Sequence, residues 1–198
     1  MYPTRYPINM DFGKTLYVTN RGQWRSWLDK NHDKEKEIWL IYYRKSSGKP
    51  RIPYNDAVEE ALCYGWIDSI QKGIDEEKFA QRFSKRKPTS SLSVANKERI
   101  GLLIQQKKMT VYGLNAISKI YDNSKDNKEQ PTIAPDILNP IKANKKAWKN
   151  FQKLPERYKR VRIGFIESRR LHGNERFQKS LQHFIEMTTK NKKFGNMK

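Results

Sequence analysis

A polar stretch near the middle of the chain, DNSKDNKEQPTIAPD at residues 122–136, most constrains the fold. It contains two prolines and has no hydrophobic period, so neither a helix nor a strand is expected to run through it. Before this stretch helix-like and strand-like patterns alternate, whereas after it the pattern is helical. We therefore expect an α+β core domain over residues 1–121, a linker or long loop over 122–136, and a basic helical C-terminal region over 137–198.

The first part predicts a small antiparallel β-sheet with packed helices. Asn55 and Ser93 are plausible N-caps of two of these helices, because their side chains accept hydrogen bonds from unpaired backbone N–H groups. Pro88 ends the last strand, since proline has no N–H to donate to a neighbouring strand. The expected strands are 37–45, 66–71 and 78–86, the last two forming a hairpin, and the expected helices are 21–32, 53–65, 94–109 and 110–122.

The second part predicts three helices, punctuated by Pro155 and Gly173. Each has apolar residues at helical spacing, which are expected to form the core of this region. The helices and their expected buried residues are 137–154 (Ile141, Trp148, Phe151), 156–170 (Tyr158, Val161, Phe165) and 174–189 (Phe177, Leu181, Phe184, Ile185).

The composition carries a formal charge of +20, from 41 Lys and Arg against 21 Asp and Glu. A field of that sign concentrates nucleic acid, anionic lipid or acidic proteins near the surface. The excess is uneven, because residues 137–198 hold 17 basic and 4 acidic side chains. The helical region is therefore the place to look for an anionic partner.

The lone cysteine, Cys63, has no second cysteine to pair with, which fits a reducing compartment. Residues 1–14 have no continuous apolar run of the kind found in a secretory signal. No stretch approaches the roughly 18 apolar residues of a membrane span. We therefore expect a cytoplasmic protein without a membrane span.

The segment QRFSKRKPTSSLSVANK, residues 81–97, places basic side chains directly before a run of hydroxyls and an expected helix start. The first N–H groups of a helix lack partners within it, and the helix dipole favours negative charge there. The segment therefore indicates a cradle for a phosphate or carboxylate, although a solvated turn before a capped helix is the simpler interpretation. The candidate anion-binding residues are Trp66, Asp68, Arg82, Arg86, Lys87, Ser93, Asn96 and Lys97.

Within this cradle, Asp68 could lie near Arg82 if the two hairpin strands pair. A structural salt bridge is the simpler interpretation of such a pair. Alternatively, the carboxylate orients the guanidinium toward a planar anion, which the fixed fork of arginine suits better than lysine.

A second constellation is a set of cations on the C-terminal helices. Lys142, Lys145, Lys149 and Lys153 are spaced three or four apart, which would place them on one face of a single helix, opposite Trp148 and Phe151. A charged helix face is normally the solvent side, but here the acidic residues that usually intersperse such a face are nearly missing. The candidate polyanion-surface residues are Lys142, Lys145, Lys149, Lys153, Arg160 and Arg169.

Motifs for metals, cofactors and nucleophilic catalysis are missing from the sequence. His32, His172 and His183 lie in separate segments without ligand spacing, and no nucleotide-binding glycine motif occurs. Cys63 lies on the apolar side of a helix, where a buried thiol is the usual outcome. We expect no metal and no cofactor, and we identify no catalytic residue.

Residues 60–117 resemble the YdeI/OmpD-associated family, also called bacteriocin-protection proteins. The resemblance rests on ALCYGWIDS, QRFSKRKPTS, the S-x-x-NK helix entry at Ser93 and the later M-x-x-x-GL, and PERYKRVRIGFIESRR resembles the usual ending of the family. It extends over roughly residues 36–190. This chain departs from the family at Leu92, where members commonly have Trp, and near Lys107, where they have a small residue.

The resemblance implies a bacterial protein of poorly defined activity that is linked to protection against bacteriocins or antimicrobial peptides. Together with the charge, it favours a non-enzymatic stress or protection protein that binds nucleic acid or another polyanion. An enzyme acting on a small phosphorylated or carboxylated molecule at the 82–97 cradle is the first alternative. A protein-interaction module for an acidic partner is the second.

Overall fold

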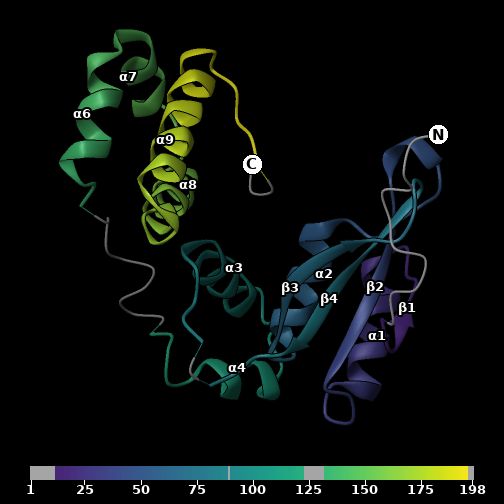
Figure 1. Cartoon of the computed structure of the whole chain (residues 1–198). Coiled ribbons are helices and arrows are strands. Elements are labelled where there is room, and N and C mark those ends of the chain that lie inside the picture. Colours follow the sequence, from purple (N-terminus) through teal and green to yellow (C-terminus); the bar gives the residue numbers. More distant parts are fainter. Residues whose placement is uncertain (1–11, 89, 123–131, 196–198) are drawn as a thin grey trace, which may run out of the picture. The chain divides into compact units, whose positions relative to one another are not determined.

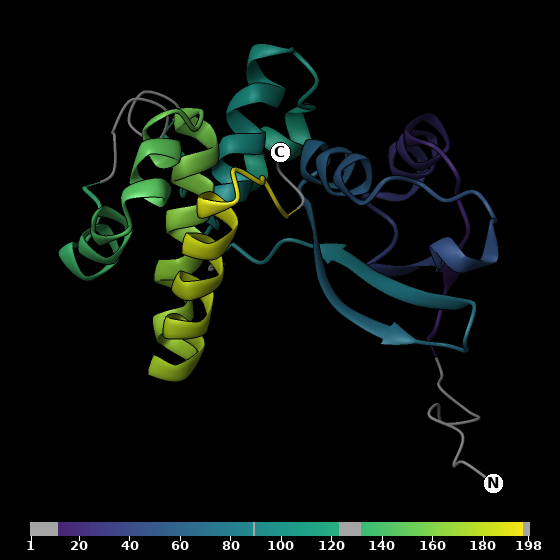
Figure 2. The same cartoon turned by 90° about the horizontal axis from the view of Figure 1, so that it is seen from above.

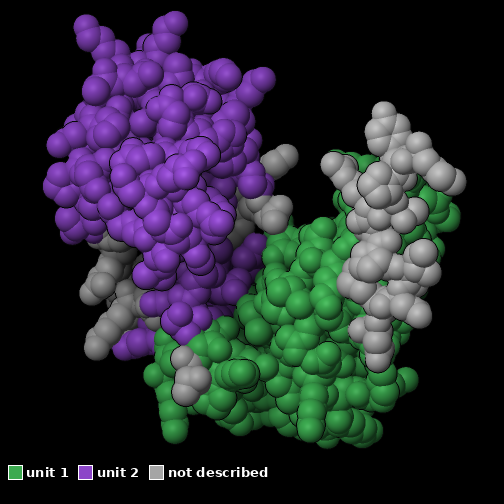
Figure 3. All heavy atoms as spheres, viewed as in Figure 1, with its two compact units in different colours: residues 1–90, 103–120 green, residues 91–102, 121–198 purple. Residues whose placement is uncertain are grey.

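The structure, a computed structural model, describes residues 12–88, 90–122 and 132–195, which divide into two compact units. The first unit comprises residues 1–90 and 103–120, and the second comprises 91–102 and 121–198 (Figure 3). The α+β class is confirmed. One boundary between the units lies between residues 120 and 121, and residues 91–102 cluster with the helical unit. Most of the expected linker, 122–136, and the stretch 1–11 lie outside the described residues.

The first unit contains a four-stranded sheet of order β1-β2-β4-β3 with helices against it (Figure 1). β1 runs parallel to β2, so the sheet is mixed, whereas the predicted 66–86 hairpin is confirmed by the antiparallel β3–β4 pair. Its elements are β1 (Thr15–Leu16), α1 (Arg21–Asn31), β2 (Glu37–Tyr43), η1 (Lys45–Ser47), α2 (Tyr54–Cys63), β3 (Trp66–Gly73), β4 (Lys78–Lys85) and α4 (Val111–Ile117).

Helices α1 and α2 lie on one side of this sheet (Figures 1 and 2). Trp24 and Leu28, one turn apart on α1, are fully buried, and the Trp24 indole N–H donates to the carbonyl of Ala57 at 3.0 Å. The Trp24 ring also packs against Phe83 of β4. These two residues of α1 are therefore part of the core of the first unit.

The start of α2 differs from the prediction. The helix begins at Tyr54, and Pro53 rather than Asn55 occupies the N-cap position. Proline fixes its φ near −65°, and Pro53, at φ −58° and ψ 135°, holds the extended backbone that precedes the first turn. Its carbonyl then accepts the N–H of Ala57.

The second unit contains the C-terminal helices, of which α9 packs along α7 and α8 (Figure 1). Helix α3 (Val94–Gln105) contributes its residues up to Leu102 to this unit. The remaining elements are α6 (Pro135–Ala143), α7 (Lys145–Gln152), α8 (Glu156–Ser168), η2 (Arg169–His172) and α9 (Asn174–Thr189). Their core includes Ile137, Ile141, Phe151, Tyr158, Ile163, Phe177, Leu181 and Phe184.

The single helix predicted over 137–154 is wrong, because the chain breaks at Asn144 into α6 and α7. Asn144 has φ −91° and ψ 100°, and its side chain accepts the backbone N–H of Ala147. Asparagine is a favoured N-cap, so it stabilises a new helix start better than a continued helix. Phe165, predicted to be buried on α8, is 43% exposed. Among the described residues no helix has the length and apolar character needed to cross a membrane.

The contact between α2 and α4 depends on a residue without a side chain. The carbonyl of Cys63, at the end of α2, accepts both the backbone N–H and the hydroxyl of Thr110. Thr110 in turn caps α4 by accepting the N–H of Gly113. A Cβ on Gly113 would lie 2.2 Å from the Cys63 carbonyl oxygen, which is closer than any side chain tolerates. Glycine at this position therefore allows the two helices to meet.

We expect Gly113→Ala to destabilise the protein by about 1–3 kcal/mol, the usual cost of overpacking a well-packed site. The sign of the change in unfolding free energy is informative, because Gly→Ala inside an unobstructed helix stabilises the protein by up to about 1 kcal/mol. Gly22→Ala on α1 is the matched control, since its added Cβ meets only the Asn20 side chain at 3.4 Å. Urea unfolding of both variants measures the difference, and a Gly113→Ala protein as stable as the parent would contradict the close approach.

Candidate functional site

The predicted cradle is divided between the two units. Trp66, Asp68, Arg82, Arg86 and Lys87 belong to the first unit, and Ser93, Asn96 and Lys97 belong to the second. Most of these side chains form hydrogen bonds or ion pairs with other residues of their own unit.

Asp68 and Arg82, whose pairing the sequence left open, do not pair. In the register of the hairpin Asp68 lies opposite Phe83, so the neighbouring Arg82 points to the other face of the sheet. Asp68 accepts a hydrogen bond from the Tyr54 hydroxyl at 2.6 Å. Arg82 instead forms an ion pair with Glu37 of β2, and this hydrogen bonding lowers the pKa of the Glu37 carboxyl. The Arg82 guanidinium therefore has a counter-charge within its own sheet.

Trp66 and Arg86 contribute to the interior of the first unit. Trp66 is 1% exposed, and its indole N–H donates to the carbonyl of His32. Arg86 is 9% exposed and donates to the carbonyl of Ser90 at 2.7 Å, while burial lowers the pKa of its guanidinium. Of the cradle cations in this unit, Lys87 is the one that the structure exposes to solvent.

In the second unit the predicted cap is confirmed, since the Ser93 hydroxyl accepts the backbone N–H of Asn96 at the start of α3. The Asn96 side-chain oxygen accepts from Arg99, and Lys97 is half-buried. Ser93 lines a groove of about 710 Å³, formed by residues 91–95, one face of α8 and part of η2. The Ser93 part of the cradle thus faces open space.

The lysines of α6 and α7 form an exposed cationic surface of the second unit. Because of the break at Asn144, Lys142 belongs to α6, whereas the others belong to α7 and its C-cap. All are exposed, and among the described residues no carboxylate lies within ion-pair distance of them. We call this set the lysine surface: Lys142, Lys145, Lys146, Lys149 and Lys153.

The two arginines predicted for the same surface have other contacts. Arg160 forms a bidentate ion pair with Glu98, whose carboxylate is 8% exposed. The positive charge of Arg160 is therefore neutralised within the second unit. Arg169 stacks over the Phe165 ring at 4.6 Å. Arg160 therefore stabilises the folded unit, because a buried carboxylate needs a paired cation.

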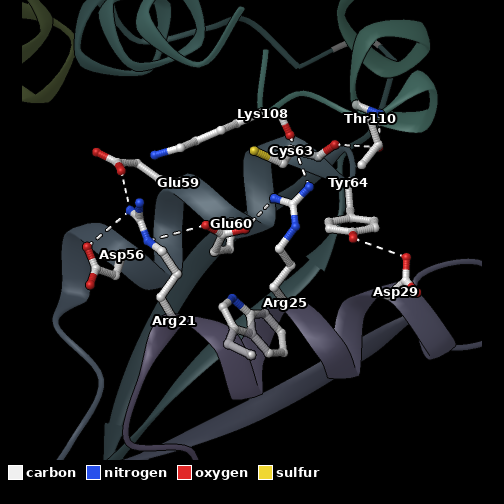
Figure 4. Close-up of polar contacts among 12 residues, drawn as sticks. Arg21, Arg25, Asp29, Asp56, Glu59, Glu60, Cys63, Tyr64, Lys108 and Thr110 are labelled. Atoms are coloured by element: carbon white, nitrogen blue, oxygen red, sulfur yellow. Dashed lines mark hydrogen bonds and ion pairs between the residues drawn. The ribbon is translucent and has the colours of Figure 1, made fainter. Parts of the chain in front are cut away.

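A charge network that the sequence interpretation did not include joins α1 to α2 (Figure 4). Glu60 of α2 is 1% exposed and lies between two arginines of α1, 3.2 Å from Arg21 and 2.7 Å from Arg25. Arg21 also pairs with Asp56 and Glu59, and Arg25 donates to the carbonyl of Lys108 at 3.2 Å.

The arginines and carboxylates of this network neutralise one another. Burial opposes the charged form of Arg21 and Arg25, but hydrogen bonding to Glu59 and Glu60 respectively raises the pKa of both guanidinium groups. With every carboxylate of the network bonded to an arginine, the cluster holds α1 against α2 and leaves little capacity for a ligand. Helical spacing could have shown it, because Arg21 and Arg25 are four residues apart on one helix face.

Cys63 follows the network on α2 and is fully buried. Burial raises the pKa of its thiol to about 11, with the Glu60 carboxylate acting in the same direction. A thiol in this state is a poor nucleophile. Among the described residues no group of three or more His, Cys, Asp or Glu side chains is placed to hold a metal ion.

We expect Glu60→Gln to lower the free energy of unfolding by about 2–3 kcal/mol. The change removes a charge that two arginines share, and the cost stays below the 3–5 kcal/mol of a fully buried pair because both arginines are about one-third exposed. Glu59→Gln, which alters a carboxylate 28% exposed on the same helix, is the control and should cost less than ~1 kcal/mol. Equal losses of unfolding free energy in the two variants, measured by chemical denaturation, would show that Glu60 contributes no more to stability than Glu59.

The Cys63 thiol predicts a pH dependence of stability. Its folded pKa of about 11 exceeds the ordinary value of 9.0, so the folded state holds the proton more tightly than the unfolded state. The resulting stability is complete below pH ~9 and is lost as the pH rises toward ~11, by up to about 2 kcal/mol. Other groups titrate identically in Cys63→Ala, so the fall in unfolding free energy over this range should be smaller in that variant. Parallel curves for the two proteins would refute the assignment.

Comparison with known proteins gives one match. A family model described as a domain of unknown function (DUF8412) matches residues 16–116, which include the elements from β1 to most of α4. No curated protein and no solved structure matches the chain. The matched segment ends before α6, so the lysine surface lies outside it.

Proposed function

This chain belongs to the DUF8412 family through its residues 16–116, and we propose that it is a non-enzymatic protein that binds a polyanion, nucleic acid first among them, through its C-terminal helices. The observation that carries the proposal is the lysine surface, with its exposed ammonium groups and no described carboxylate in contact.

The pairing of the carboxylates gives this observation its weight. The described Asp and Glu side chains of the second unit that form ion pairs are bonded to cations outside the lysine surface. Glu98 pairs with Arg160, Asp136 and Glu167 pair with Arg170, and Glu175 pairs with Lys179.

Helix α7 supplies a second argument. Its first two residues are Lys145 and Lys146, and its first turn has no acidic residue. The N-terminus of a helix has partial positive charge, so cations there are unfavourable by a few tenths of a kcal/mol to about 1 kcal/mol each. A polyanion over this end of α7 would offset both the dipole and the repulsion between the lysines.

Exposed lysines bind polyanions by charge and counterion release, which requires no ordered catalytic group. The non-enzymatic part of the proposal rests on this. The resemblance to the YdeI/OmpD-associated family, with its protection role, stays a prediction in the same proposal. We also propose a cytoplasmic location, because the one cysteine is a buried thiol.

The test is a fluorescence anisotropy titration with labelled single- and double-stranded oligonucleotides at several salt concentrations. The logarithm of the binding constant should fall with the logarithm of salt concentration at about −0.9 per phosphate neutralised on duplex DNA. Lys145→Gln with Lys149→Gln should flatten this slope by about 2 × 0.9, because two phosphate contacts are lost.

The matched control is Lys30→Gln with Lys34→Gln, which removes the same charge from two exposed lysines of the first unit. It should leave the slope nearly unchanged. Equal flattening by both pairs would assign the binding to net charge, and weak binding even at low salt would contradict a nucleic-acid partner. Capture of polyglutamate but not of oligonucleotides under the same conditions would point to an acidic protein instead.

A further inference from the structure

A second groove of the helical unit lies between α8 and α9 and has a volume of about 230 Å³. Its lining combines phenyl rings with cationic or titratable side chains, all within the second unit: Phe165, Phe184, Phe194, Arg162, Lys179 and His183. The lysine surface belongs to α6 and α7 and contributes no residue to it.

The chain after α9 forms one wall of this groove. The Tyr158 hydroxyl donates to the carbonyl of Phe194 and accepts its backbone N–H at 3.0 Å, which fixes this segment to α8. The Phe194 ring then packs against Phe184 and makes an edge contact with His183 at 4.6 Å. The wall is therefore built by specific contacts.

Arg162 is the unusual member of the lining. Its guanidinium lies over the rings of Tyr158, Phe165 and Phe194, 5.0 Å from the centroid of Phe194. Among the described residues no carboxylate pairs with it, and its Nε is buried without a hydrogen-bond partner. A Cβ on Gly195 would lie 2.5 Å from one terminal nitrogen, so the backbone of that glycine closes one side of the guanidinium.

The neighbouring carboxylates are bonded elsewhere and do not supply a counter-charge. On α8 and α9 these bonds are Glu156 to Lys159, Glu167 to Arg170, Glu175 to Lys179 and Glu186 to Gln182. Burial lowers the pKa of Arg162, which expresses the cost of desolvating a cation without an anion beside it. Arginine nevertheless remains charged at neutral pH, so the groove holds one uncompensated positive charge.

We propose that this groove binds a small aromatic carboxylate, with its ring among Phe165, Phe184 and Phe194 and its carboxylate on Arg162. Binding sites for drug-sized molecules measure about 300–1,000 Å³, so a groove of about 230 Å³ suits a ligand with a single ring. The planar guanidinium matches a carboxylate in geometry, and one unpaired cation matches a monoanion in charge. Lys179 forms an exposed ion pair with Glu175 on α9, whereas Arg162 has no described carboxylate partner.

The test uses 4-fluorobenzoate and the full chain, with binding followed by ¹⁹F NMR. We expect saturable binding to the parent protein and a loss of affinity of about tenfold or more in Arg162→Gln, the range for a hydrogen bond to a charged group. Arg169→Gln is the matched control, because Arg169 also stacks on Phe165 but does not line the groove. It should bind as the parent does.

Ligand controls keep the test decisive if Arg162→Gln folds poorly by circular dichroism. In the parent protein 4-fluorobenzyl alcohol and acetate should both bind at least tenfold more weakly, since one lacks the charge and the other the ring. Equal binding of the alcohol, equal affinity in a folded Arg162→Gln protein, absence of saturable binding of 4-fluorobenzoate, or tighter binding of phenyl phosphate would each overturn the proposal. Lys145→Gln with Lys149→Gln should leave benzoate binding unchanged, so this proposal and the proposed function fail separately.

Discussion

With 41 lysines and arginines against 21 aspartates and glutamates, carboxylates are scarce in this chain, and their placement determines which cations serve the fold. The buried carboxylates, Glu60 and Glu98, each bind two arginines: Glu60 joins α1 to α2, and Glu98 joins α3 to α8 within the second unit. This follows from solvation, because a buried carboxylate is stable only beside a cation, and the planar guanidinium suits shared pairing. The lysines of the lysine surface, whose ammonium groups are strongly hydrated, remain exposed to solvent.

The periodic patterns of the sequence predicted most helices and strands, because each apolar stripe reports a local geometry. The hairpin and α9 were found in this way, as was α1. The break at Asn144 was missed, although the signal was present: an asparagine three residues before Ala147 competes as a cap with the continued helix. The parallel strand β1 is two residues long, too short for any period to show.

The candidate site was harder to predict, since a side chain's partner depends on tertiary contacts. Arg82 has Glu37 as its partner, 45 residues away, because β2 lies beside β4, and hairpin register alone decides that Asp68 faces the other side of the sheet. Composition did predict where cations would lack carboxylates, as the lysine surface shows. It could not show that Arg160 is bound to Glu98 or that Arg162 has aromatic rings and no carboxylate, because both facts require the packed helices.

The lysine surface and Arg162, which have no carboxylate partner among the described residues, differ in their exposure to solvent. The lysines of the lysine surface are exposed to solvent, so the attraction that they exert is screened within about 8 Å at physiological salt. Arg162 is half-buried among phenyl rings, where screening is weaker and a contacting anion gains more from the same charge. A long-range, salt-sensitive attraction suits a polymer of phosphates, whereas a short-range, salt-tolerant one suits a single small anion. The two proposed binding modes therefore differ in the packing around the cation, although both draw on the same excess of positive charge.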